Sequence, residues 1–176
     1  IQNVRVSPSG DQAVFIHWPA GGRGDLNRTG NLMLADATGR VRVLSGGWTS
    51  LAGIGWSPDG KEVWFTATKD GLFQPQSLYA VTLSGRHRTL LRLGHSIVLT
   101  DVSRDGRALV LYENRRVETR GRLEGDETER DLSWFDRTSA VKLDGDGRTV
   151  VFGEDGEAGG RLGATYLRGL GATPPV

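Results

Sequence analysis

The chain has 176 residues, of which 37% are hydrophobic, and it contains no cysteine. The hydrophobic fraction suffices for a folded core, and the lack of cysteine excludes disulfides, Cys-ligated zinc and thiol nucleophiles. Twenty-two basic against 21 acidic residues leave a formal net charge of +1. This is far from the concentrated positive field that a nucleic-acid backbone requires, so we predict no nucleic-acid partner.

The start of the chain and its hydropathy bear on its context. No apolar run approaches the roughly 20 residues that a helix needs to cross a bilayer. The chain starts at Ile1, without an initiator methionine or the charged-then-apolar pattern of a signal peptide. We therefore expect a segment of a longer protein that makes no membrane contact of its own, and the composition leaves its compartment open.

One short pattern recurs four times along the chain. Aligned on a turn glycine, the copies are VRVSPSGDQAVFI around Gly10, IGWSPDGKEVWFT around Gly60, TDVSRDGRALVLY around Gly106 and VKLDGDGRTVVFG around Gly147. Successive turn glycines are 50, 46 and 41 residues apart. A period in this range is typical of repeat architectures, in which each copy is one supersecondary unit.

Each copy has the chemistry of a tight hairpin turn. Three residues before the glycine stands a side chain whose oxygen can accept hydrogen bonds from turn N–H groups, namely Ser7, Ser57, Ser103 or Asp144. Pro8 and Pro58 fit the next position because their φ is already set for a type I turn. The glycine is expected in the left-handed conformation that closes a three-residue hairpin.

The residues after each turn are continuously apolar. The four runs are Ala13–Phe15, Val63–Phe65, Leu109–Leu111 and Val150–Phe152. A run without polar alternation indicates a strand covered on both faces, so we expect central strands with another sheet stacked on each side. A second apolar segment and a second turn follow in each copy, for example Leu32–Leu34 before Gly39. Each copy thus predicts two hairpins, and repeated four-stranded units of about 40 to 50 residues are typical of a β-propeller.

The predicted fold is all-β, a single β-propeller segment over 1–176 made of four-stranded antiparallel blades. The blades are expected at about 1–47, 48–95, 96–135 and 136–176; three are complete and the fourth lacks its outer strand. Propellers close with about 4 to 8 blades. We therefore expect either additional blades of the parent chain or a homo-oligomer that forms through the exposed blade faces.

The turns resemble those of the TolB or PD40 type of WD40-like propellers, whose blades carry an SPDGK turn followed by an apolar strand with Phe. Ser57 through Lys61 and Phe65 match this pattern fully, and the turns at Gly10 and Gly106 each differ from it by one residue. The resemblance implies a bacterial, extracytoplasmic (periplasmic) protein. Such propellers occur in periplasmic translocation proteins, in sensor regions of serine/threonine kinases and in gating domains ahead of prolyl-oligopeptidase-type hydrolases. The segments Leu132–Phe135 and Tyr166–Arg168 most resemble the kinase-associated kind.

The sequence contains no pattern typical of a catalytic or metal centre. It lacks a G-x-S-x-G nucleophile elbow, and His17, His87 and His95 share no repeated position. The alternate carboxylates of Asp144–Gly147 hint at calcium, but no Glu follows at the spacing of a calcium loop and the same slot is a plain turn in the other copies. We predict a protein that is not an enzyme and holds no cofactor or metal.

Loop residues are the candidates for ligand binding. The connections between the second and third strands vary in length and charge, and in a propeller they gather with the interblade connections at one end of the channel. The candidates are Arg23, Asp25, Arg28, Trp48, Lys69, Asp70, His95, Arg115, Arg116 and Trp134. For Trp48 and Trp134, interblade packing is an equal alternative. The mixed-charge stretch 113–131 is favoured as a solvated edge hairpin over a binding face.

These features predict a non-catalytic binding or sensor module that recognises a protein, a peptide or a small polar ligand. One alternative is an accessory propeller that filters substrate for a prolyl-oligopeptidase-type hydrolase domain outside this chain. Another is an assembly scaffold that oligomerises through open blade edges.

Overall fold

The computed structural model describes residues 1–19, 29–71, 74–113, 116–122, 125, 127–135, 137–145, 147–155 and 157–170. It divides the chain into two compact units, unit 1 (Ile1–Glu113) and unit 2 (Asn114–Val176). Within the described residues, no helix has the length and apolar character needed to span a membrane.

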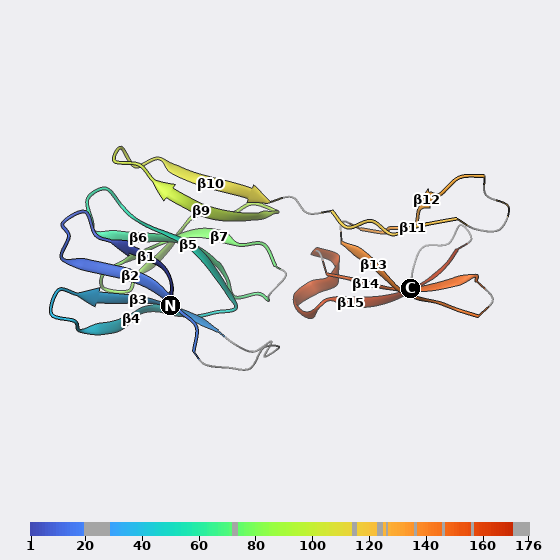
Figure 1. Ribbon diagram of the computed structural model, residues 1–176, viewed down its shortest axis with the longest axis horizontal. Helices are drawn as coiled ribbons and strands as arrows, with labels where there is room; N and C mark the ends of the chain where they lie inside the picture. The colour runs from blue at the N-terminus through green and yellow to red at the C-terminus, as the bar shows by residue number, and fades with distance from the viewer. Residues whose placement is uncertain are drawn as a thin grey trace. The chain divides into compact units, whose positions relative to one another are not determined.

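Unit 1 begins with two four-stranded antiparallel blades (Figure 1). The first consists of β1 (Gln2–Val6), β2 (Gln12–His17), β3 (Gly30–Asp36) and β4 (Val41–Trp48), paired in that order. The second repeats this meander with β5 (Ser50–Trp56), β6 (Glu62–Thr68), β7 (Ser77–Thr82) and β8 (His87–Leu91). A further hairpin follows, made of β9 (Ser96–Val102) and β10 (Ala108–Glu113). The prediction of four-stranded antiparallel blades is confirmed in both complete sheets.

The predicted corner geometry is present in all four repeats. The turn glycines have positive φ angles of 79° at Gly10, 68° at Gly60, 83° at Gly106 and 69° at Gly147. In each turn the glycine N–H donates to the carbonyl oxygen three residues earlier, at 2.9 to 3.1 Å in the four turns. The Ser or Asp side chain then fixes the start of the next strand, as where Ser57 Oγ accepts from the N–H of Glu62 at 2.9 Å.

The two complete blades pack face to face. Their shared core consists of Val14, Ile16, Leu32, Leu34, Leu44, Trp48, Leu51, Ile54, Trp56, Val63, Phe65, Ala67 and Val81. Phe65 on β6 is fully buried, and its ring meets the ring of Trp48 edge-on with 5.3 Å between centroids. The neighbouring Trp64 packs against a different cluster, formed by Leu78, Ile97 and Leu99. Strand β6 is therefore covered on both faces, as its apolar run predicts.

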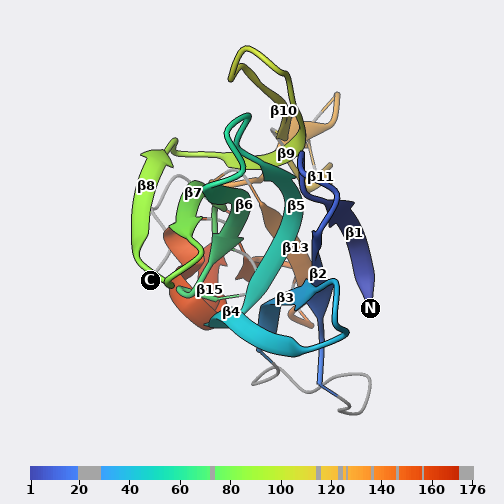
Figure 2. The same ribbon diagram turned by 90° about the vertical axis from the view of Figure 1, so that its left-hand side faces the viewer.

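The first strands of three successive repeats, β1, β5 and β9, are neighbours in unit 1 (Figure 2). Two glycines permit the close approach of β5 to β9. A methyl group on Gly53, whose φ is +31°, would lie 2.0 Å from the carbonyl oxygen of Leu99. A methyl group on Gly55 would lie 2.7 Å from Cγ2 of Val102. Side chains at these two positions would force the strands apart.

The predicted third blade, 96–135, differs from the structure in its pairing. Among the described residues, β9 and β10 form a two-stranded sheet of unit 1, whereas β11 (Arg120–Gly121) and β12 (Arg130–Asp131) form a separate two-stranded sheet of unit 2. The third strand of this blade is predicted at 117–123, and its described part, 117–122, carries charges such as Glu118, where β3 and β7 carry buried leucines. Adding it to β10 would bury little apolar surface, so the usual driving force for sheet growth is weak there.

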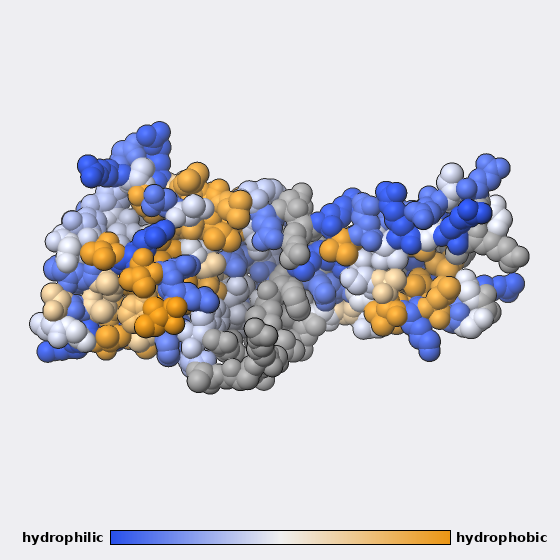
Figure 3. Space-filling view, in the orientation of Figure 1, coloured by the Kyte–Doolittle hydropathy of each residue, from blue (hydrophilic) through white to orange (hydrophobic). Residues whose placement is uncertain are grey.

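The expectation that every apolar run is covered on both faces is corrected at β10. Leu109 is 62% exposed and Leu111 is 59% exposed, although both belong to the repeated apolar run. Within the described part of unit 1, β10 pairs with β9 alone, and no sheet stacks on these side chains. Figure 3 shows apolar surface on unit 1. Further exposed valines of unit 1 are Val4, Val6, Val41 and Val43.

Unit 2 contains a three-stranded antiparallel sheet of β13 (Thr138–Leu143), β14 (Thr149–Glu154) and β15 (Ala164–Gly169). A 3-10 helix, η1 (Glu157–Leu162), occupies the connection between β14 and β15. The buried core of this unit consists of Leu132, Val150, Phe152 and Leu170, with Tyr166 packed against it. The sheet has the three strands predicted for a fourth blade without an outer strand; residues 171–176, which follow it, lie outside the described residues.

Candidate functional site

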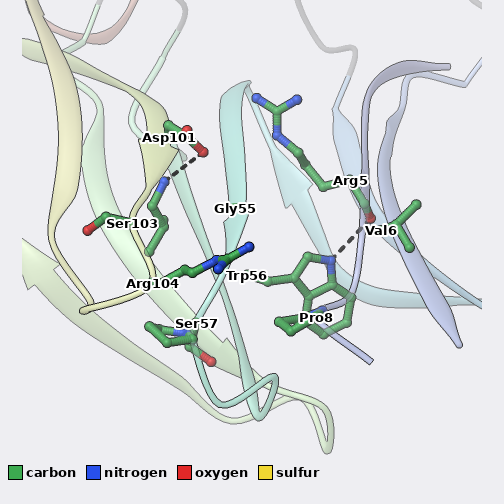
Figure 4. Close-up of a pocket in the computed structure, with 11 residues that line it drawn as sticks. Arg5, Val6, Pro8, Gly55, Trp56, Ser57, Asp101, Ser103 and Arg104 are labelled. Atoms are coloured by element: carbon green, nitrogen blue, oxygen red, sulfur yellow. Dashed lines mark hydrogen bonds between the residues drawn. The ribbon is translucent and has the colours of Figure 1, made fainter. Parts of the chain in front are cut away.

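A pocket of about 550 Å³ lies in unit 1 where three repeated turns come together (Figure 4). It is lined by Arg5, Val6, Pro8, Gly55, Trp56, Ser57, Pro58, Asp101, Val102, Ser103 and Arg104. These residues are the ends of β1, β5 and β9 and the turn residues that follow each strand. The pocket is therefore built by the repeat itself, at the opposite end of the inner strands from the loops that sequence reasoning favoured.

The walls of the pocket are held by contacts between successive repeats. Trp56 is 7% exposed, and its indole Nε1 donates to the carbonyl oxygen of Arg5 at 3.1 Å, which ties β5 to β1. The turns also nest against one another. A methyl group on Gly60 would lie 3.7 Å from Cδ of Pro8, and one on Gly106 would lie 3.8 Å from Cγ of Pro58. The apolar part of the lining is thus fixed by packing rather than by loose loops.

Three ionisable side chains line the pocket, and two of them are cations. Arg5 Nη2 donates to the carbonyl oxygen of Thr100 at 3.3 Å, so this guanidinium reaches from β1 across to β9. The carboxylate of Asp101 accepts the N–H of Val102 at 2.9 Å (Figure 4). Arg104 follows Ser103 in the third turn. Two guanidinium groups and one carboxylate give the pocket a net positive charge around an apolar and aromatic lining.

Two further carboxylates in these turns serve the turns themselves. The Ser57 hydroxyl donates to Asp59 at 2.7 Å and, with the N–H of Lys61, lowers the pKa of that carboxyl. The Ser103 hydroxyl, followed by Arg107, lowers the pKa of Asp105 in the same way. These acids stay ionised and are held by their own turns, and neither lines the pocket.

Four of the predicted ligand-binding residues, Arg23, Asp25, Arg28 and Arg115, lie outside the described residues. The other six are described, and none of them lines the pocket.

Trp48 and Lys69 are brought together by the structure. Trp48 is 4% exposed, and Lys69 Nζ lies 4.6 Å from the centroid of its ring. The indole Nε1 of Trp48 donates to Ser45 Oγ at 2.7 Å, and His87 Nε2 lies 2.8 Å from the same hydroxyl. Burial lowers the pKa of His87, and the charge of Lys69 adds to this effect. The cluster joins β4 of the first blade to β8 of the second, which is the interblade packing that was the alternative for Trp48.

Asp70 and His95 make separate contacts in unit 1. Asp70 forms an exposed ion pair with Arg92 at 3.6 Å, and the ring of His95 meets the ring of Tyr112 with 5.5 Å between centroids. Neither pair forms part of a common site with Trp48 and Lys69 in the contacts that the structure describes.

Arg116 and Trp134 lie in unit 2. Arg116 forms ion pairs with Glu118 at 2.9 Å and with Asp131 at 3.2 Å, as expected for a solvated charged hairpin. Trp134 is 42% exposed, and the guanidinium carbon of Arg168 lies 5.6 Å from its ring centroid.

Sequence reasoning missed the pocket residues Arg5, Trp56 and Arg104. One signal was visible in the alignment of the repeats. The position after the turn serine is Pro in the first two copies and Arg in the third, although the turn is the same. A residue that departs from its repeat without a change in backbone is free to serve another purpose.

The comparisons with known proteins bear on the fold. No family model and no curated protein sequence matches the chain. Among solved structures, it is similar to a puromycin-hydrolyzing peptidase of Mycobacterium tuberculosis, with a TM-score of 0.50 and 16% identity over 99% of this chain and 28% of that one. It is also similar to TolB from Acinetobacter baumannii, with a TM-score of 0.48 and 14% identity over 99% of this chain and 43% of that one.

A third solved structure is the β-propeller domain of the Trilobed protease from Pyrococcus furiosus, with a TM-score of 0.43 and 15% identity over 97% of this chain and 55% of that one. The chain thus spans less than two thirds of the length of each of these structures. At such low identity the likeness concerns the fold alone. The chain is an all-β segment whose antiparallel sheets match segments of β-propellers.

Proposed function

We propose that this propeller segment is a non-catalytic recognition module that holds a peptide or a small polar ligand in the pocket of unit 1. The observation that carries the proposal is the convergence of three repeated turns on a pocket of about 550 Å³. Ligand sites typically have volumes of about 300 to 1,000 Å³ and combine an apolar lining with a few placed polar groups. Trp56 and the two prolines supply the apolar lining. The polar groups are those of Arg5, Asp101 and Arg104.

The rigidity of the lining supports this function. Trp56 is anchored by its indole hydrogen bond to Arg5, and the successive turns are nested through Pro8 and Pro58. A site whose walls are already ordered loses little conformational entropy when a ligand arrives, so more of the contact energy appears as affinity.

The contacts of the Ser–His pair in unit 1 favour packing over hydrolysis. Ser45 Oγ lies 2.8 Å from His87 Nε2, a distance that would suit a nucleophile and its base. However, Ser45 is 4% exposed, and its hydroxyl also accepts the indole N–H of Trp48. These contacts give Ser45 Oγ a packing and hydrogen-bonding role between Trp48 and His87.

Blocking the pocket with a bulky side chain tests the proposal. Val6 and Val4 are both exposed valines of β1, but only Val6 lines the pocket. The binding of the wild-type chain and of both variants is measured on an array of acetylated, amidated hexapeptides. We expect the wild-type chain and the control Val4→Trp to bind the same subset of peptides. Val6→Trp should not bind this subset. The proposal fails if no peptide retains the wild-type chain, or if Val6→Trp retains the same peptides as the wild type.

Self-association is a second candidate function, and the exposed apolar residues of unit 1 favour it. Leu109 and Leu111 on β10 and Val41 and Val43 on β4 present apolar side chains to solvent. Sedimentation of the wild-type chain over a range of concentrations would show an oligomer that the double variant Leu109→Lys, Leu111→Lys dissociates. A concentration-independent monomer would rule this candidate out. Association with a kinase or a hydrolase domain stays a prediction, which the parent gene on either side of this segment would test.

A further inference from the structure

The position after the turn serine is structurally equivalent in the three turns that form the pocket. It holds Pro8 in the first turn, Pro58 in the second and Arg104 in the third. All three turns close with the glycine N–H on the serine carbonyl oxygen, at 3.0, 2.9 and 3.0 Å respectively. The backbone therefore accepts proline at this position, and the turn itself gives no reason for an arginine.

The guanidinium of Arg104 faces the pocket and is available. Figure 4 shows its side chain directed from the third turn towards Trp56. Among the residues that the structure describes, no carboxylate lies within ion-pair distance of Arg104. By contrast, Arg107 of the same hairpin forms an ion pair with Asp105 at 2.8 Å. The third turn thus carries one cation that stabilises the turn and one that points into the pocket.

Arg5 reinforces the positive charge from the opposite wall. Its single side-chain hydrogen bond in the described contacts, to the Thr100 carbonyl oxygen, uses one of the five N–H donors of a guanidinium. The hydrogen bond from Trp56 to the Arg5 carbonyl oxygen fixes the backbone of this residue. The acidic side chain in the lining, Asp101, has one oxygen engaged by the N–H of Val102. The two guanidinium groups therefore outweigh the carboxylate.

We propose that the pocket binds an acidic peptide and that Arg104 is the anchor for a ligand carboxylate, with Arg5 as the second cation. A guanidinium matches a carboxylate with two parallel N–H···O bonds, and such charge-assisted bonds are stronger than neutral ones. Pro8, Pro58 and Val102 provide an apolar wall beside the cation. The fitting ligand is therefore an Asp or Glu side chain flanked by apolar residues. This inference rests on the proposed function, because it names the ligand class of the same pocket.

Paired peptides test the ligand class directly. The probes are Glu- or Asp-containing hexapeptides retained by the wild-type chain on the array, each compared with its Gln or Asn counterpart. We expect the acidic peptide to bind at least roughly tenfold more tightly than the amide peptide in fluorescence anisotropy, and the difference to shrink at high salt. Equal retention of acidic and amide peptides would overturn the proposal while leaving peptide recognition intact.

Arg104→Pro tests the anchor with little risk to the fold, since it installs the residue that the other two turns already carry. This substitution should lower the affinity for the acidic peptide by at least roughly tenfold and leave the affinity for the amide peptide unchanged. Lys61→Gln is the matched control because it removes one exposed cation from a neighbouring turn outside the pocket. Circular dichroism would verify the fold of each variant. Unchanged binding of the acidic peptide to Arg104→Pro, or an equal loss with Lys61→Gln, would refute the assignment of Arg104.

Discussion

Strands β6 and β10 have the same sequence pattern but different surroundings. Each follows a Ser-x-Asp-Gly turn and contains a continuous apolar run, Val63–Phe65 on β6 and Leu109–Leu111 on β10. Phe65 on β6 is fully buried between two layers, whereas Leu111 at the equivalent position of β10 is 59% exposed. The local turn forms equally well in both hairpins, so the difference does not arise from the turn.

An apolar run shows that a strand can be buried between two sheets. Whether the strand is buried depends on the presence of neighbouring sheets. β6 pairs on both edges, with β5 and β7, and packs against clusters on both faces. β10 pairs with β9 alone among the described residues. Most of the hydrophobic stabilisation of a blade is therefore expected to come from its neighbours, because burial rather than composition sets this term.

Truncating the equivalent side chains should show the largest difference between the two strands. Phe65→Ala should lower the free energy of unfolding by about 3 to 5 kcal/mol, because it removes a buried ring and leaves a cavity. Leu111→Ala should change it by no more than about 0.5 kcal/mol, as for most exposed positions. Urea unfolding followed by circular dichroism measures both. Equal losses would mean that β10 is covered in solution.

Substitutions where β5 and β9 approach each other closely should give the next largest loss of stability. Gly53→Ala should cost more than about 1 to 2 kcal/mol, because a methyl group would meet the Leu99 carbonyl oxygen at 2.0 Å in addition to the cost of a positive φ. Gly10→Ala is the control: its φ is +79°, and a methyl group there would have no neighbour within 4 Å. The melting temperatures of the two variants give the comparison, and a milder effect at position 53 would contradict the close approach.

Replacing the turn serines should lower the free energy of unfolding by a smaller amount, and this amount should differ between the hairpins of β6 and β10. Ser57 is buried, and its Oγ accepts the N–H of Glu62; Ser103 is exposed, and its Oγ accepts the N–H of Arg107 at 3.0 Å. Ser57→Ala should cost about 1 to 2 kcal/mol because it leaves a partly buried donor without that partner. Ser103→Ala should cost less, since water replaces the lost bond. Identical losses in urea unfolding would show that the surroundings of the turn do not matter.

The smallest expected effect concerns an ion pair that β6 makes across its sheet. Arg88 on β8 donates two hydrogen bonds to Glu62, at 3.0 and 2.6 Å, and this lowers the pKa of Glu62 below its ordinary value of 4.5. The stabilisation is therefore present above that value and is lost as the pH falls through the lowered pKa. Arg88→Gln should flatten the decline of the urea midpoint between about pH 5 and pH 3, whereas the control Arg86→Gln should not. An unchanged slope in Arg88→Gln would show that the pair contributes nothing.

The sequence predicts well what local chemistry determines. The Ser/Asp-x-x-Gly corners, their left-handed glycines and two of the three complete blades predicted follow from turn residues and from apolar runs, and these are present. The pairing of 117–122 is not predictable from the same signals, because it depends on whether a charged segment gains more from β10 or from another partner. The pocket was also beyond local reasoning, since Arg5, Trp56 and Arg104 are about 50 residues apart and meet only when the inner strands lie side by side. Of these three residues, only Arg104 is marked in the sequence, because it replaces the proline that the first two repeats carry at the same position.

The equivalence of positions 8, 58 and 104 has a consequence for engineering. Each is the second residue of a turn that its serine and glycine close, so exchanging its side chain leaves the hydrogen bond of the turn in place. Three such positions surround one cavity, so the charge, size and polarity of its lining can be varied separately at each of them. Libraries varied at these three codons would reprogram the selectivity of the cavity without redesign of the blades.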